Sequence, residues 1–136
     1  MYSPEMTKPM ELELTTRGIK ALHTTEEVDE ALQKEGTTMV VVNSVCGCAA
    51  GNARPGALFS LQHSKTPDNS YTVFAGVDSD AVKKAREYFT GKLPSSPSIA
   101  LLKNKELVFM LERKDIEGHS PDEVSNSLKR AFDEYC

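Results

Sequence analysis

Short apolar runs alternate with segments of helical periodicity along the chain. The clearest apolar run, Thr38–Asn43, is rich in valine and is typical of a buried strand. Further β-rich runs predict strands at Tyr71–Ala75, Ser98–Leu102 and Leu107–Leu111. The last two are separated by Lys103-Asn104-Lys105, so they predict an antiparallel hairpin.

Helical periodicity and capping residues predict two helices before the first strand. Apolar residues recur at helix-compatible spacing from Pro9 to about Leu22, with Gly18 as an interruption. Thr24 and Glu27 match a capping box, in which each side chain binds the other's free backbone N–H group. A second helix therefore begins there and stops before Gly36, a residue suited to a left-handed turn.

Three more helices are expected after the first strand. A helix after Cys48 runs to about Gln62, and its glycines and proline predict a bend. Asp80–Phe89 forms the next helix. Ser120-Pro121 begins the last, with a serine cap followed by proline at the first helical position, and this helix carries Cys136.

This order of elements predicts an α/β fold. Two strands joined through a helix pair in parallel, and the hairpin and last helix complete a small mixed sheet with helices on both faces. The topology is thioredoxin-like. The length of 136 residues and the absence of a linker predict a single domain, residues 1–136, with the first helix as an N-terminal extension.

Composition and charge narrow the classes of partner. The net charge is −4 and the 16 basic residues are scattered among 20 acidic ones, so a basic stripe for nucleic acid is missing from the sequence. Neither a signal peptide nor an apolar run of membrane-spanning length is present, which predicts a cytoplasmic protein without membrane contact. Three cysteines do not suit a disulfide framework and favour catalysis or metal binding.

Cys46-Gly47-Cys48 lies where the first strand meets a helix. A helix start favours a thiolate because free backbone N–H groups and the helix dipole point at it. We therefore predict Cys46 as the nucleophile and Cys48 as the resolving thiol. Gly47 permits the tight ring that a disulfide across one residue requires. Spacing alone also fits half of a metal site or two incidental cysteines, although no histidine lies at close ligand spacing to the pair, so we expect no metal there.

Several other residues are candidates for the site. Ser96-Pro97 is either an ordinary turn or a cis proline whose backbone docks a substrate chain near the cysteines. Asn43 and Ser44 flank the cysteine loop and are expected to end the strand and cap the helix. Arg54 is either a source of positive charge for the thiolate or a structural ion-pair partner. Cys136 is either a second resolving thiol or a bystander.

The segment from Val41 to Gly51, followed by Ala53-Arg54-Pro55, closely resembles the bacilliredoxin family. The resemblance extends over essentially the whole chain, through segments that match the family pattern: Phe74-Ala75-Gly76, Arg86-Glu87-Tyr88-Phe89, Ser95-Ser96-Pro97-Ser98, Ile116-Glu117-Gly118-His119 and Cys136. One departure is Arg113-Lys114-Asp115, where a histidine is expected after the arginine. His119 is interpreted as a solvated loop residue.

The resemblance implies a thiol–disulfide oxidoreductase of thioredoxin-like fold. It implies Cys46 as nucleophile, Pro97 at the cis-proline position, and proteins capped by the thiol bacillithiol as substrates. Bacillithiol is then a co-substrate, and no tightly bound cofactor is expected. Two alternatives share the residues: a general disulfide isomerase or reductase, and a non-catalytic metal or iron–sulfur scaffold that uses Cys46, Cys48 and Cys136.

Overall fold

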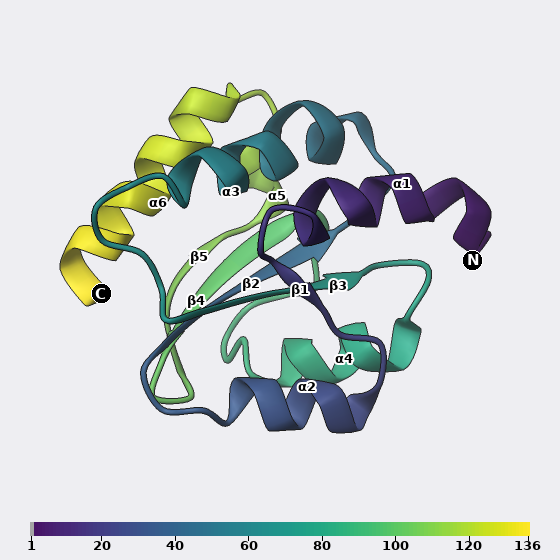
Figure 1. Cartoon of the computed structure of the whole chain (residues 1–136), viewed down its shortest axis with the longest axis horizontal. Helices are drawn as coiled ribbons and strands as arrows, with labels where there is room; N and C mark the ends of the chain where they lie inside the picture. The colour runs from purple at the N-terminus through teal and green to yellow at the C-terminus, as the bar shows by residue number, and fades with distance from the viewer. Residues whose placement is uncertain (1) are drawn as a thin grey trace.

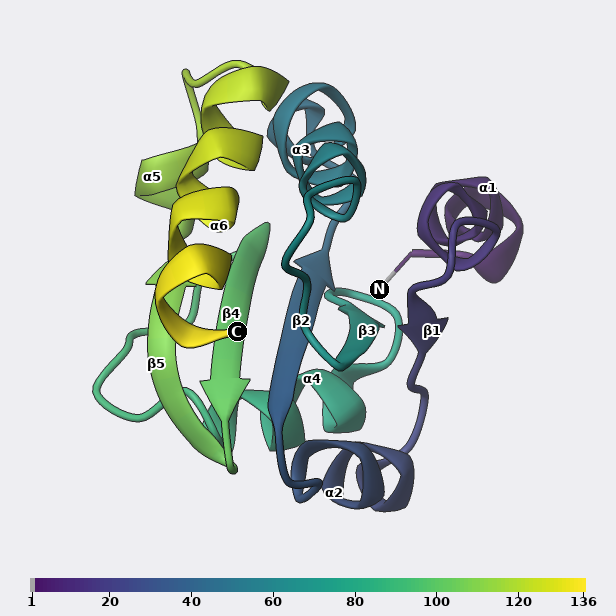
Figure 2. The ribbon, with the colours of Figure 1, turned by 60° about the vertical axis from the view of Figure 1, so that its left-hand side comes forward.

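Strand β2 (Thr37–Asn43) lies at the centre of the sheet, and all of its residues are buried. The computed structural model describes residues 2–136. The sheet has the order β1-β3-β2-β4-β5, in which β2 is parallel to β3 and antiparallel to β4 (Figures 1 and 2). The other strands are β1 (Lys20–Ala21), β3 (Asn69–Phe74), β4 (Ser98–Lys103) and β5 (Glu106–Leu111). The predicted strands, their parallel pair and their hairpin are confirmed.

Helices cover both faces of this sheet. Figure 1 shows α2 and α4 on one face, and α1, α3 and α6 on the other. Their bounds are α1 (Pro4–Thr15), α2 (Thr25–Leu32), the π-helix η1 (Ala49–Ala53), α3 (Arg54–Ser60), α4 (Ser79–Glu87), α5 (Arg113–Ile116) and α6 (Pro121–Tyr135). Among residues 2–136, no helix has the length and apolar character needed to cross a bilayer. The predicted α/β class with helices on both faces is confirmed.

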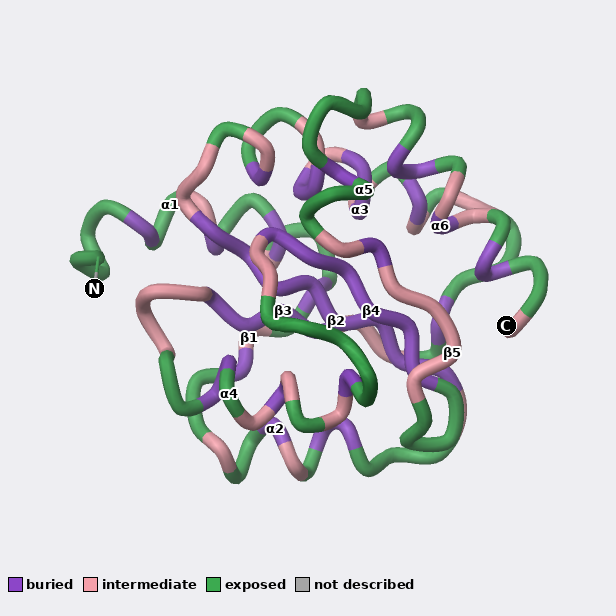
Figure 3. Tube along the Cα trace, turned by 180° about the vertical axis from the view of Figure 1, so that it is seen from behind, coloured by how far each residue is buried: buried purple, intermediate pink, exposed green. Residues whose placement is uncertain are grey.

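The valine-rich strand β2 divides the core into two parts because successive side chains point to opposite faces of a sheet. Met39 and Val41 join the cluster beneath α3 and α6, which includes Phe132. Val40 and Val42 join the cluster against α2 and α4. Figure 3 shows β2 buried throughout and β4 buried up to its exposed last residue, Lys103, while β5 at the edge is only half-buried over most of its length. The central strand therefore packs against both helical layers, and it ends where the cysteine loop begins.

The predicted N-terminal helix is real but its bounds are wrong. Helix α1 begins earlier, at Pro4, because the Ser3 side chain caps it by accepting from the Met6 amide. It ends at Thr15, and Gly18 then adopts a left-handed φ of 97°. The chain continues as the short strand β1 beside β3. The buried apolar residues beyond Gly18, Ile19 and Leu22, flank this strand and fill the core from extended chain rather than from a helix.

Other local signals are confirmed, with one difference at the end of α2 and one additional helix. The capping boxes at Thr24 and Ser120 both form. Gly36 is left-handed, with a φ of 90°, but α2 already ends at Leu32. The bent helix after Cys48 is a π-helical segment followed by α3. The short helix α5 was not predicted.

Gly56 allows α3 to approach α6 closely. A Cβ added at Gly56 would lie 2.5 Å from Val124 Cγ1 and 3.3 Å from the carbonyl oxygen of Pro121. We expect Gly56→Ala to lower the free energy of unfolding by about 1–2 kcal/mol, because overpacking outweighs the gain in helix propensity. The shift of the urea midpoint measures this. Gly51→Ala is the matched control, since a Cβ there meets nothing within 4 Å, and an equal loss in both variants would contradict the packing argument.

Candidate active site

Cys46 and Cys48 lie in the loop and first helical turn that follow β2. The helical residues begin at Gly47, and the carbonyl oxygen of Cys46 accepts from the amides of Ala49 and Ala50 at 3.0 and 3.3 Å. Cys46 thus occupies the helix start that the sequence predicted. The two sulfurs are joined in a disulfide, with the Cα atoms 5.4 Å apart. Both cysteines are half-buried, and Gly47 between them is exposed.

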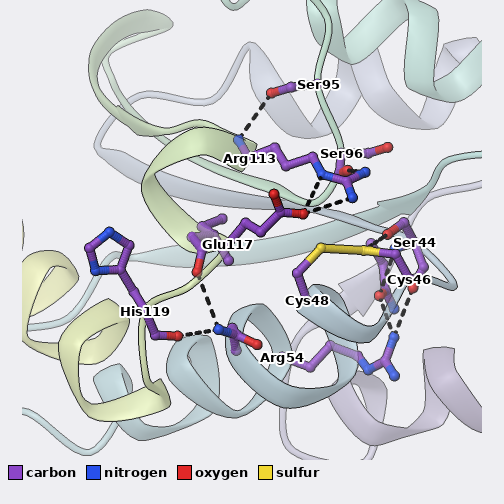
Figure 4. The surroundings of a disulfide bond; sticks show 12 residues. Ser44, Cys46, Cys48, Arg54, Ser95, Ser96, Arg113, Glu117 and His119 are labelled. Atoms are coloured by element: carbon purple, nitrogen blue, oxygen red, sulfur yellow. Dashed lines mark hydrogen bonds and ion pairs between the residues drawn. A yellow bond between two sulfur atoms is a disulfide. The ribbon is translucent and has the colours of Figure 1, made fainter.

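Asn43, the last residue of β2, and Ser44, which follows it, hold the cysteine loop in place through hydrogen bonds. The Ser44 hydroxyl donates to Cys46 Sγ at 3.5 Å (Figure 4). The Ser44 amide donates to Asn43 Oδ1 at 2.9 Å, and Asn43 Nδ2 donates to the carbonyl oxygen of Met10 in α1 at 3.2 Å. Asn43 is fully buried. The N-terminal helix is therefore tied to the cysteine loop through one asparagine.

Arg54 is a buried structural residue, as the second of its two interpretations expected. It is 3% exposed. Its Nη1 donates to Asn43 Oδ1 and to the carbonyl oxygen of Ser44, each at 2.9 Å, and its Nε pairs with the carboxylate of Glu13 in α1. The guanidinium is consequently engaged on three sides beneath the loop and is not free to bind a substrate.

The Ser96–Pro97 peptide bond is cis and lies beside the end of β2. Ser98 pairs with Val42 in the antiparallel register of β2 and β4. Pro97, the residue before Ser98, therefore lies opposite the end of β2, where the cysteine loop leaves the sheet. Pro97 is buried and Ser96 is half-buried. The carbonyl oxygen of Ser95 accepts from Arg86 Nη2 at 3.2 Å, which helps to fix this segment. Two segments more than forty residues apart in the chain thus meet at one site.

A cleft of about 210 Å³ opens beside Cys46. It is lined by Tyr2, Ser44, Val45, Cys46, Ala75, Gly76, Ser96 and Arg113. The N-terminal segment forms part of the wall, because the Tyr2 amide donates to the carbonyl oxygen of Gly76 at 2.9 Å. Arg113 is the one charged residue among these eight lining residues, which all belong to the described part of the chain. The cleft therefore joins the nucleophile candidate, the segment of the cis proline and one guanidinium.

Arg113 is the residue that sequence reasoning missed. Its Nη1 donates to the carbonyl oxygen of Ser96 at 3.3 Å, and its amide donates to Ser95 Oγ at 3.3 Å. Its Nε and Nη2 donate to Glu117 Oε2 at 3.2 and 2.9 Å. The available signal was the hairpin: β5 returns antiparallel to β4 and so carries the residues after Leu111 back towards Pro97.

Cys136 lies apart from this site. Its thiol is near Thr37 at the start of β2, and burial raises its pKa. Cys46 follows the other end of that strand, and a strand of this length spans roughly 20 Å. The structure therefore does not bring Cys136 to Cys46 and Cys48, either as a resolving thiol or as a third ligand of one ion.

His119 also faces elsewhere. It lines a second, larger cavity of about 570 Å³ beside β5 and α6, and its Nδ1 lies 3.4 Å from Glu123 Oε2. Figure 4 shows the imidazole pointing away from the disulfide. We assign the site to the smaller cleft because Cys46 lines it.

One cluster of possible metal ligands lies outside the cysteine site. Within residues 2–136 it consists of Glu11, His23 and Asp78, whose ligand atoms lie within 4.8 Å of one another. His23 Nδ1 lies 3.1 Å from Asp78 Oδ2, and its Nε2 lies 3.8 Å from Glu11 Oε2. Because its two nitrogens face different carboxylates, the ring bridges them, and the cluster includes no cysteine.

Sequence comparison extends over nearly the whole chain. The profile of a family described as disulphide isomerase matches residues 2–136. A bacilliredoxin of Halalkalibacterium halodurans is 54% identical over 91% of this chain and 86% of its own. A bacilliredoxin of Cytophaga hutchinsonii is 52% identical over 98% of this chain and 99% of its own.

Structural comparison supports the fold independently. Mitochondrial thioredoxin 3 of Saccharomyces cerevisiae, in its oxidised form, superposes with a TM-score of 0.58 and 14% identity over 90% of this chain and 98% of that one. Oxidised thioredoxin from Plasmodium falciparum gives a TM-score of 0.55 and 21% identity over 87% and 98%. The predicted thioredoxin-like fold is confirmed.

Proposed function

Because the chain belongs to the bacilliredoxin family and has the thioredoxin fold, it is a thiol–disulfide oxidoreductase, and we propose that it removes bacillithiol from S-bacillithiolated proteins. Cys46 is the proposed nucleophile and Cys48 the resolving thiol. The proposed substrates are cytoplasmic proteins, and bacillithiol is the thiol that is released.

The observation that supports this proposal most strongly is the Cys46–Cys48 disulfide beside the cleft. Cys46 rather than Cys48 lines the cleft, so a substrate there meets Cys46 first. Two features favour its thiolate once the pair is reduced: the helix start at Gly47 and the hydroxyl of Ser44, which donates to Sγ.

The first step is an exchange without net oxidation. The Cys46 thiolate attacks the bacillithiol sulfur of the mixed disulfide. A bond forms between Cys46 Sγ and that sulfur, the bond to the substrate protein breaks, and the substrate cysteine leaves as a thiolate that takes up a proton. Ser96 and Pro97 are proposed to bind the substrate chain during this attack.

The second step clears Cys46. The Cys48 thiolate attacks Cys46 Sγ, bacillithiol leaves as a thiol, and the Cys46–Cys48 disulfide forms. The mixed disulfide has then gained two electrons, and the enzyme pair has lost them. A dithiol or two thiols must reduce the pair before the next cycle. Alternatively, free bacillithiol attacks the capped Cys46, which regenerates the thiol directly and releases bacillithiol disulfide.

Cys48→Ser distinguishes these routes. Without added thiol, we expect the reduced variant to stop after one turnover with bacillithiol retained on Cys46, because the resolving sulfur is missing. Intact mass spectrometry follows both proteins, and the wild type should instead release the cap and become oxidised. Excess bacillithiol should restore turnover in the variant through the second route. Absence of a Cys46 adduct in the variant would contradict the mechanism.

The family description favours a second candidate, disulfide isomerisation of proteins. The same thiolate would attack a protein disulfide in place of the mixed disulfide. Recovery of activity by a scrambled disulfide protein measures this function, and removal of bacillithiol from a capped protein measures the first. If isomerisation is much the faster of the two, the second candidate is the better description.

A further inference from the structure

We propose that Arg113 is the specificity-determining residue of the cleft and binds a carboxylate of bacillithiol while Cys46 attacks the cap. The inference rests on the proposed function, since it names the group that recognises the same substrate. It depends on the position and charge of one residue that lies far from the cysteines in the sequence.

The cleft selects for negative charge. The residues that line it besides Arg113 are uncharged, and the Ser44 and Ser96 side chains among them are polar. A guanidinium presents several N–H donors in a plane, which suits a carboxylate better than an ammonium does. A cap that carries carboxylates therefore finds one complementary charge beside the sulfur that accepts it.

The contacts of Arg113 hold it in place and leave it available. One nitrogen is fixed on the Ser96 carbonyl oxygen at 3.3 Å. The other partner, Glu117, is on the surface: the side chains of Arg113 and Glu117 are 46% and 60% exposed. Exposed ion pairs of this kind contribute at most about 1 kcal/mol. Glu117 can consequently move aside in water when a substrate carboxylate approaches.

The other arginine near the cysteines does not fit this role. Arg54 is 3% exposed and already engaged by Glu13, Asn43 and Ser44 beneath the loop. It does not line the cleft. The positive charge that a bacillithiol carboxylate meets is therefore that of Arg113.

This placement also determines which sulfur is attacked. A carboxylate held at Arg113 positions the bacillithiol half of the mixed disulfide in the cleft beside Cys46. Attack then occurs on the bacillithiol sulfur, and the substrate protein leaves. Attack on the other sulfur would attach the substrate protein to Cys46 instead.

Two mixed disulfides of the same model protein test the inference, one with bacillithiol and one with cysteamine, which has no carboxylate. For Arg113→Gln we expect KM for the bacillithiol cap to rise about tenfold, with a much smaller effect on the cysteamine cap. Lys114→Gln is the matched control, because it removes the same charge one residue away, outside the cleft. It should leave the ratio of the KM values for the two caps unchanged. Glu117→Gln should lower KM for the bacillithiol cap.

An equal loss for both caps in Arg113→Gln would overturn the inference and indicate that the arginine only supports Ser96. An unchanged KM would overturn it as well. Binding of S-methyl bacillithiol, which cannot exchange, separates the two proposals. If wild type binds this probe and Arg113→Gln binds it about tenfold more weakly, the inference stands even where turnover of capped protein fails. If wild type turns over the bacillithiol cap and Arg113→Gln is unaffected, only the inference fails.

Discussion

Cys46→Ser is expected to reduce removal of bacillithiol from a protein to the uncatalysed background, a loss on the order of 10³-fold or more. A serine hydroxyl is not ionised at neutral pH, and only an ionised thiol attacks a disulfide at a useful rate. The substitution keeps the size of the side chain and its place at the start of the helix. Intact mass spectrometry of the capped substrate over time measures the loss.

Cys136→Ser is the matched control for this experiment. It also replaces one thiol by a hydroxyl, but at the opposite end of β2, so we expect full activity. Retained turnover in Cys46→Ser would reject the proposed nucleophile. Stoichiometric metal in anaerobically purified wild type, lost in Cys46→Ser, would instead favour the scaffold alternative.

Local sequence signals predicted the part of the site that is contiguous in the chain. The valine-rich strand, the cysteines at its end and the helix start are determined by neighbouring residues, and all appear where expected. The capping boxes at Thr24 and Ser120 are local in the same sense. The Ser96–Pro97 bond is cis, as the family resemblance implied, whereas the local sequence left an ordinary turn open as well.

The rest of the site depends on register and tertiary contact. A β-bulge lies in the β4–β5 hairpin near Leu101 and Leu102, and the pairing on its far side joins Ile99 to Leu111. At the turn, Lys103 pairs with Glu106 and Leu102 with Leu107. If this register continued without the bulge, Pro97 would lie opposite Glu112 instead of Arg113. One extra residue in a strand thus changes the sign of the charge at the cleft, and apolar patterning does not reveal it.

The first helix was predicted only approximately for a related reason. Helical spacing continues past Gly18 in the sequence, but the residues after it pair with β3 as an edge strand. A two-residue strand has no periodicity of its own to detect. The role of α1 beneath the cysteine loop is equally hidden, since it depends on buried contacts of Asn43 and Arg54 with distant residues.

Arg54→Met is expected to lower the free energy of unfolding by about 3 kcal/mol. Methionine fills the space of the stem but removes the donor from the Ser44 carbonyl oxygen and one of the two donors from Asn43 Oδ1, which still accepts from the Ser44 amide. A buried acceptor that loses its donor costs roughly 1–3 kcal/mol. Glu13 adds less because it is half-exposed and regains water. Urea unfolding measures the change.

Two further variants test this account of Arg54. Arg54→Lys keeps the charge, but its donors lie on one nitrogen and lack the planar fork with which Arg54 reaches Glu13 from Nε and the two oxygens from Nη1, so its loss should be about half as large. Arg130→Met removes an exposed arginine whose Nη2 donates to the Ser127 hydroxyl, and it should change stability by less than about 0.5 kcal/mol. Equal stability of Arg54→Met and wild type would show that the ion pair and its hydrogen bonds do not hold α1 against the cysteine loop.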